Sequence, residues 1–147
     1  MRFRHWPGYY EARRDFFRCS DMEFFANAPC ALTETQLQAA ITGPRLAECC
    51  ASIDRVIDWK GGCGEIYCLW GEFKVNREII RGGLRFTLPE CPNALAWTLT
   101  CGTDSASPSI RIHCTINRST HEPEFIESIR IFVEDWRLGM ARLCATA

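Results

Sequence analysis

The sequence predicts an α+β fold: a curved antiparallel sheet with two short helices, crossed on its concave face by one long C-terminal helix. Apolar and polar residues alternate through consecutive segments between residues 53 and 117. This alternation is typical of antiparallel strands that turn one face inward. One long amphipathic pattern then spans Pro123 to Cys144, and we expect it to cover the sheet.

The bulk composition favours one soluble globular domain. The chain has 147 residues, 47% of them hydrophobic and 24% charged, with a formal net charge of -1. Such a charge gives no global field to recruit nucleic acid or anionic lipid. Met1–Tyr10 lacks a continuous apolar stretch, and no segment approaches the roughly 18 apolar residues of a membrane span. The sequence therefore predicts a cytoplasmic protein without a membrane span.

Residues 1–21 form a basic-aromatic arm that precedes a single domain at 22–147. Alternating arginines and aromatic rings can bind single-stranded nucleic acid, because arginines neutralise phosphates and rings stack on bases. The alternative is an arm whose rings pack on the domain while its arginines face water. Near-neutral charge elsewhere favours that alternative, so we expect no nucleic-acid partner.

The first part of the domain predicts a strand followed by two short helices. The strand covers residues 22–26. Thr33 and Gln36 have capping-box spacing, which predicts the start of a helix that Gly43-Pro44 ends. A second short helix is expected over residues 45–51.

The sheet is expected to continue as a meander of five strands. The predicted strands cover residues 52–59, 65–75, 78–88, 94–101 and 109–117. Asn76-Arg77 is the expected hairpin tip, and Gly82-Gly83 predicts a bulge or bend that lets the sheet curl.

The closing helix carries a wide apolar stripe at steps of three and four residues. The stripe consists of Phe125, Ile129, Phe132, Trp136, Met140 and Leu143. Charged residues mark the opposite face, so we expect the stripe to lie against the concave face of the sheet.

Ten cysteines raise the question of a metal or disulfide site. No C-x-x-C pair occurs, and His5, His113 and His121 do not flank a cysteine pair at ligand spacing. We therefore expect no metal and no cofactor. The cysteines are expected to be mainly small buried hydrophobes, with a reactive thiol, a metal ligand or a disulfide as the alternatives.

Three stretches carry a resemblance to a known superfamily. They are Phe24–Leu46; Arg77–Thr100, which reads REIIRGGLRFTLPECPNALAWTLT; and Trp136 with Leu138 and Leu143. Together they resemble the START/Bet v1-like helix-grip (SRPBCC) superfamily, most closely its polyketide-cyclase and Hsp90-ATPase-activator-homologue branch. Two features depart from that pattern: the N-terminal arm, and a sheet with one strand fewer after the helix pair.

The resemblance implies a cavity between sheet and helix that holds a small apolar molecule. Members bind lipids, sterols or aromatic polyketides; some catalyse cyclisation and others bind protein partners. The expected ligand-binding residues are Tyr67, Leu69, Phe73, Phe86, Trp97, Leu99, Ile112, Cys114, Phe132 and Trp136. The Tyr67 hydroxyl and the Trp97 indole N–H are the expected polar handles, because a buried donor requires a partner. The alternative is that the same side chains fill a dry core.

No catalytic motif accompanies this pattern, so catalytic residues remain unassigned. The sequence has no G-x-S-x-G, no helix-linked Gly-rich phosphate loop and no H-E-x-x-H. His113 falls on the expected solvent face, and Glu65 and Glu72 fall on opposite faces. A cyclase or hydrolase would need a polar group inside the cavity.

Two functions are therefore kept. The first is binding of a small apolar, lipid- or polyketide-like ligand without a cofactor. The second is a protein-interaction module, such as an adaptor, an immunity protein or a co-chaperone-like subunit, with a filled core. Either a homodimer or a protein partner is compatible with the sequence.

Overall fold

The computed structural model of the protein describes residues 22–117 and 121–146. The basic-aromatic arm at 1–21 lies outside the described residues, so its separation from the domain stays a prediction. The elements are β1 (Met22–Pro29), α2 (Glu34–Ala40), η1 (Gly43–Arg45), α3 (Leu46–Cys49), β2 (Ile53–Lys60), β3 (Cys63–Cys68), β4 (Gly71–Ile80), β5 (Gly83–Thr87), β6 (Ala96–Cys101), β7 (Ser109–Ile116) and α4 (Pro123–Thr146).

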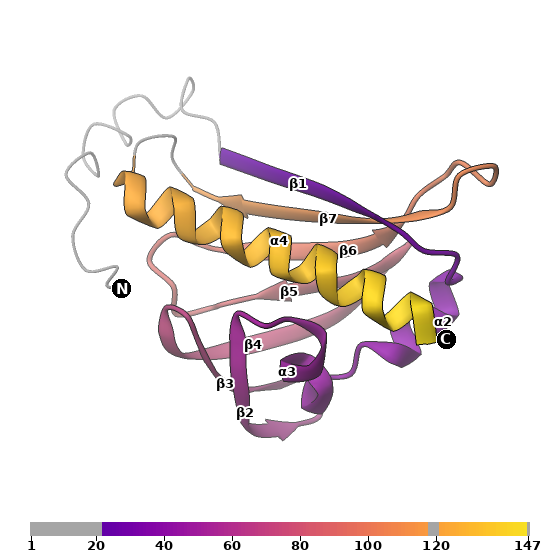
Figure 1. The fold of residues 1–147 in the computed structure, drawn as a ribbon. Coiled ribbons are helices and arrows are strands. Elements are labelled where there is room, and N and C mark those ends of the chain that lie inside the picture. Colours follow the sequence, from indigo (N-terminus) through magenta and orange to yellow (C-terminus); the bar gives the residue numbers. More distant parts are fainter. Residues whose placement is uncertain (1–21, 118–120, 147) are drawn as a thin grey trace.

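The described strands form one seven-stranded sheet in the order β1-β7-β6-β5-β4-β3-β2. Every pair is antiparallel, and β2 to β7 form a meander. The first strand pairs with the last, with Met22 opposite Ile116. Figure 1 shows α4 crossing the curved sheet, with α2 beside the C-terminal end of α4. The predicted α+β fold class is confirmed.

The single strand expected over residues 65–75 is wrong. The chain turns at Leu69-Trp70, and Gly71 adopts a positive φ of 108° that favours glycine. The expected tip at Asn76-Arg77 instead lies inside β4, and the real tip is at Arg81-Gly82. The meander therefore has six strands after the helix pair. The expectation that the sheet has one strand fewer than the superfamily pattern after the helix pair is therefore wrong.

The capping box that begins α2 is confirmed. The Gln36 backbone N–H donates to Thr33 Oγ1 at 3.2 Å, and the Thr33 backbone N–H donates to Gln36 Oε1 at 2.9 Å. At the other end, the Arg77 guanidinium donates to the carbonyls of Gln38 and Ile41 at 2.6 and 2.9 Å. A cation at a helix C-terminus satisfies orphan carbonyls, so Arg77 ties α2 to β4.

Helix α4 buries the apolar face that the sequence predicts. Its buried residues are Phe125, Ser128, Ile129, Phe132, Val133, Trp136, Gly139 and Met140. Gly139 lies against α3, where an added Cβ would overlap the Cys49 carbonyl oxygen. The close approach of the two helices therefore requires glycine at this position.

A disulfide joins Cys30, which directly follows β1, to Cys144 in the last turn of α4. The two Cα atoms are 5.5 Å apart, within the usual range for a disulfide. For these two residues the expectation of buried thiols is wrong. Among the other described cysteines, Cys63 is exposed and Cys101 is half-buried. The buried free thiols are Cys49, Cys50, Cys68, Cys91 and Cys114.

We predict that Gly139→Ala destabilises the protein. In an ordinary helix interior the change would stabilise by about 1 kcal/mol through helix propensity. Here the methyl group meets the Cys49 carbonyl, so α4 must shift, and we expect a loss of about 1–3 kcal/mol in the free energy of unfolding. Urea denaturation measures it, with Leu138→Ala on the exposed face of α4 as control. A more stable Gly139→Ala variant would show that this contact is loose.

Candidate functional site

Five of the buried aromatic residues between the sheet and α4 form a group that we call the central aromatic cluster. They are Trp70, Phe86, Trp97, Phe132 and Trp136, none more than 4% exposed. The ring centroids of Phe86 and Trp97 are 5.2 Å apart, and those of Trp97 and Phe132 are 4.8 Å apart. Trp136 lies 6.1 Å from Phe86 and 6.2 Å from Trp97. At these separations the rings are in contact.

Local structure explains why these rings meet. Phe86 on β5 and Trp97 on β6 are directly opposite cross-strand partners, and their rings stack with an interplanar angle of 18°. Phe132 and Trp136 are four residues apart on α4, so they point to the same side of the helix. Phe132 meets Trp97 edge-on at 80°. The cluster thus joins two adjacent strands to the helix.

The other expected residues on β6 and β7 extend this interior. Leu99 is opposite Ile112, Trp97 is opposite Cys114, and all four are at most 1% exposed. Leu69 and Phe73 are half-buried and pack against the core. The structure therefore brings most of the expected ligand-binding residues to one interior. Their role in binding stays a prediction.

Tyr67 is the exception, and the expectation that it faces the interior is wrong. Its side chain is 41% exposed, and the Arg55 guanidinium lies 4.9 Å from its ring centroid. Ile66 and Cys68 occupy the buried positions of β3 instead. The turn at Leu69-Trp70 reverses the alternation between β3 and β4, so a parity counted through the turn assigns Tyr67 to the wrong face.

Trp70 is the functional candidate that sequence reasoning missed. It lies in the turn between β3 and β4, and its ring centroid is 4.9 Å from that of Phe132. Its indole N–H donates to Ser128 Oγ at 2.8 Å, and that hydroxyl donates to the Phe125 carbonyl at 2.6 Å. The following Gly71 was the available signal, because glycine readily adopts the positive φ that many turns require.

Two indole donors inside the cluster have no hydrogen-bond partner within the described residues. They are Trp97 Nε1 and Trp136 Nε1, both buried. A buried donor without an acceptor costs about 1–3 kcal/mol, so native proteins rarely retain one. Trp59, by comparison, donates its indole N–H to the Gly61 carbonyl at 2.8 Å. The interior therefore holds two donors able to bind an acceptor that the described residues do not supply.

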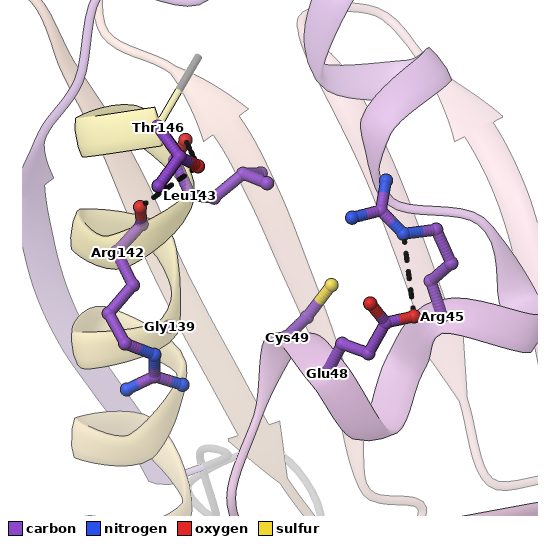
Figure 2. A pocket seen from close by; sticks show the side chains of 7 residues that line it. All are labelled: Arg45, Glu48, Cys49, Gly139, Arg142, Leu143 and Thr146. Carbon is purple, nitrogen blue, oxygen red and sulfur yellow. Dashed lines mark hydrogen bonds and ion pairs between the residues drawn. The ribbon is translucent and has the colours of Figure 1, made fainter.

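Two clefts open elsewhere at the surface. One of about 280 Å³ lies between β1 and α4, lined by residues that include Phe25 and Arg130. The other, about 180 Å³, lies between α4 and the η1–α3 segment. Figure 2 shows Arg142 on the α4 side of this cleft, Arg45 across from it, and Cys49 between them. Neither cleft is lined by the central aromatic cluster.

The buried thiols are poor nucleophiles near neutral pH. Burial raises the pKa of Cys49 to about 11, although the nearby Arg45 and Arg142 guanidiniums lower it. Burial also raises the pKa of Cys50 and Cys114 far above the ordinary thiol range. Since the thiolate is the reactive form, none of these three supplies one at neutral pH.

Other polar groups lie outside the central aromatic cluster. On the outer sheet face, the His113 ring stacks on Phe25 at 4.4 Å, and its Nε2 lies 2.8 Å from Glu23 Oε1. Within the described ranges, 22–117 and 121–146, no three His, Cys, Asp or Glu side chains gather as metal ligands. No helix in those ranges is long and apolar enough to span a membrane.

Comparison with known proteins identifies the fold. No protein-family model matches the chain, and no curated protein does. XoxI from Bacillus cereus is a similar solved structure, with a TM-score of 0.60 at 10% identity over 86% of this chain and 96% of that one. Ara h 8.0201, a Bet v1-like protein, also has a TM-score of 0.60, at 9% identity over 87% and 99%. The chain has the helix-grip, Bet v1-like fold.

A third structure with the helix-grip arrangement comes from Bacillus thuringiensis and is an uncharacterised protein. Its TM-score is 0.60 at 12% identity, covering 86% of this chain and 99% of that one. At such identities the likeness concerns the fold alone. Each neighbour is covered almost completely, so the similarity extends over the sheet and α4 rather than over one motif.

We predict that Cys63 is the first described cysteine to be alkylated in the native protein. It is exposed at the start of β3, whereas burial raises the pKa of Cys49, Cys50 and Cys114. Iodoacetamide at pH 7.5, followed by peptide mass spectrometry, should label Cys63 about tenfold or more faster than any buried thiol. Equal labelling of Cys49 in the folded chain would mean that the α3–α4 region opens freely.

Proposed function

We propose that this protein binds a small, mostly apolar molecule between the sheet and α4, against the central aromatic cluster. The observation that carries the proposal is the pair of buried indole donors, Trp97 Nε1 and Trp136 Nε1. A carbonyl or hydroxyl oxygen on an otherwise apolar ligand would accept from one or both. Ligand sites typically combine such apolar walls with a few polar groups that fix orientation.

The fold also supports binding of a small apolar molecule. Its sheet and long helix enclose the interior in which the apolar residues meet. The resemblance to the polyketide-cyclase and Hsp90-ATPase-activator-homologue branch adds the ligand class, small apolar molecules of lipid or polyketide type. Stacking on Phe86 and Trp97 suits the aromatic members of this class, because aromatic faces favour offset stacking. No catalytic step is proposed, and the cytoplasmic location remains a prediction.

Ligand binding must separate rings that now touch. The Trp97–Phe132 and Phe86–Trp97 centroid distances, 4.8 and 5.2 Å, leave no room for a ring between them. A ligand therefore binds a state in which α4 or these side chains have moved. The cost of reaching that state lowers the apparent affinity. We accordingly expect dissociation constants of about 1–100 µM rather than nanomolar binding.

The same ring contacts favour a second function, a protein-interaction module with a filled core. In that case the cluster only stabilises the fold, and function resides on the surface. Exposed Phe25, Ile57, Tyr67 and Ile79 would then be candidates for partner contact. The two functions differ in one measurable property, which is uptake of an apolar molecule by the isolated protein.

The test is titration with prodan, an uncharged fluorescent naphthalene that carries one carbonyl acceptor. We expect saturable binding at micromolar concentration. Trp97→Phe, which keeps a ring and removes the donor, should weaken binding about fivefold, the effect of one hydrogen bond. Trp59→Phe is the matched control, because its indole N–H is bonded to Gly61 outside the cluster. Absence of binding to the wild-type chain would reject ligand binding and favour the filled core.

A further inference from the structure

The last turn of α4 packs less tightly than the rest of the helix. Buried residues recur along α4 as far as Met140. Beyond it, Arg142, Ala145 and Thr146 are exposed, and Leu143 and Cys144 are half-buried. The Thr146 hydroxyl donates back to the Leu143 carbonyl of its own helix at 3.0 Å. Non-covalent packing therefore holds this turn weakly.

The cleft of about 180 Å³ separates the same turn from α3. Gly139 still lies against the Cys49 carbonyl, but one turn later Leu143, and two turns later Thr146, line open space. Figure 2 shows this divergence, with the two elements on opposite sides of the cleft. Gly139 thus lies at the border of the cleft, where α4 and α3 are still in contact.

The Cys30–Cys144 disulfide ties this loosely packed turn to the sheet. Cys30 is only 6% exposed, and its backbone N–H donates to the Pro108 carbonyl at 3.2 Å. One end of the bond is therefore fixed beside β1 and the start of β7. The other end lies on α4 two turns after Trp136, a member of the central aromatic cluster. Breaking the bond would free the part of α4 that follows Trp136.

We propose that this disulfide is a redox-controlled clasp: the oxidised form holds α4 closed, and reduction lets its last turn move away from the sheet beside Cys30 and admit the apolar ligand. The inference rests on the proposed function, because it assigns a route and a control to the same interior. Local opening of a weakly packed helix end needs far less free energy than global unfolding. The freed turn is thus the route by which we expect a ligand to enter the interior.

The chemistry is thiol–disulfide exchange with a small thiol such as glutathione. The attacking thiolate bonds to Cys144 Sγ, the more accessible sulfur, and the bonding electron pair leaves on Cys30 Sγ, which takes up a proton. A second thiolate attacks the small-molecule sulfur of the mixed disulfide and releases Cys144. The two protein sulfurs gain two electrons, and two small thiols become one disulfide. Burial keeps the pKa of the neighbouring Cys49 at about 11, so it does not compete as a thiolate.

The experiment uses the full chain, oxidised or reduced with dithiothreitol, and two measurements. Hydrogen exchange followed by mass spectrometry reports opening of residues 143–146, and stopped-flow fluorescence reports the rate of prodan uptake. Reduction should speed exchange in 143–146 about tenfold or more, leave 125–136 unchanged, and speed prodan uptake by a similar factor. Cys144→Ser should behave as reduced wild type without reductant. Cys63→Ser, which removes an exposed thiol outside the disulfide, should behave as wild type.

Four other outcomes of these two measurements would contradict the clasp, each for a different reason. Equal exchange in both redox states means that the disulfide does not hold the turn. Faster exchange throughout 125–146 means that reduction loosens the whole helix rather than its end. Prodan uptake at one rate in both states rejects the clasp but leaves the proposed function intact. No uptake in either state rejects the proposed function, and the clasp with it.

Discussion

The contact between α4 and the paired rings of β5 and β6 is the constraint on which the rest of the structure depends. β5 is the middle strand of the sheet, and Phe86 and Trp97 extend from it and its neighbour toward the helix. Phe132 and Trp136 complete the contact from α4. Because both sides contribute large rigid rings, the helix can cross the sheet in few positions. The close approach at Gly139 and the disulfide at Cys144 then fix its far end.

Two properties of this interior favour different functions. The rings touch, as they do in a core that only stabilises a fold. Yet two indole donors are buried among them with no acceptor in the described part of the chain. A purely structural core is easier to build with Phe, which has no donor to satisfy. The ligand hypothesis explains why Trp is present at positions 97 and 136, and it requires that α4 or the ring side chains can move.

Much of the fold could be predicted because its signals are local. Alternation along β6 and β7, the stripe of α4 and the Thr33–Gln36 capping box depend on residues a few positions apart. The turn between β3 and β4 could not be predicted because two apolar residues, Leu69 and Trp70, form it, and the alternation counted from Tyr67 continues through Leu69 to Phe73. Without this turn, the alternation assigns Tyr67 to the inner face of the sheet and gives no sign that Trp70 is buried. The disulfide joins residues 114 positions apart, which no local pattern can reveal.

The most direct test of this account is the free energy of unfolding of two neighbouring α4 variants, measured by urea denaturation. Phe132 is fully buried against Trp97, whereas the adjacent Ile131 is 48% exposed. We expect Phe132→Ala to cost about 3–5 kcal/mol and Ile131→Ala at most about 0.5 kcal/mol. Similar costs for the two variants, or a small cost for Phe132→Ala, would show that the fold does not depend on the contact between α4 and the central aromatic cluster.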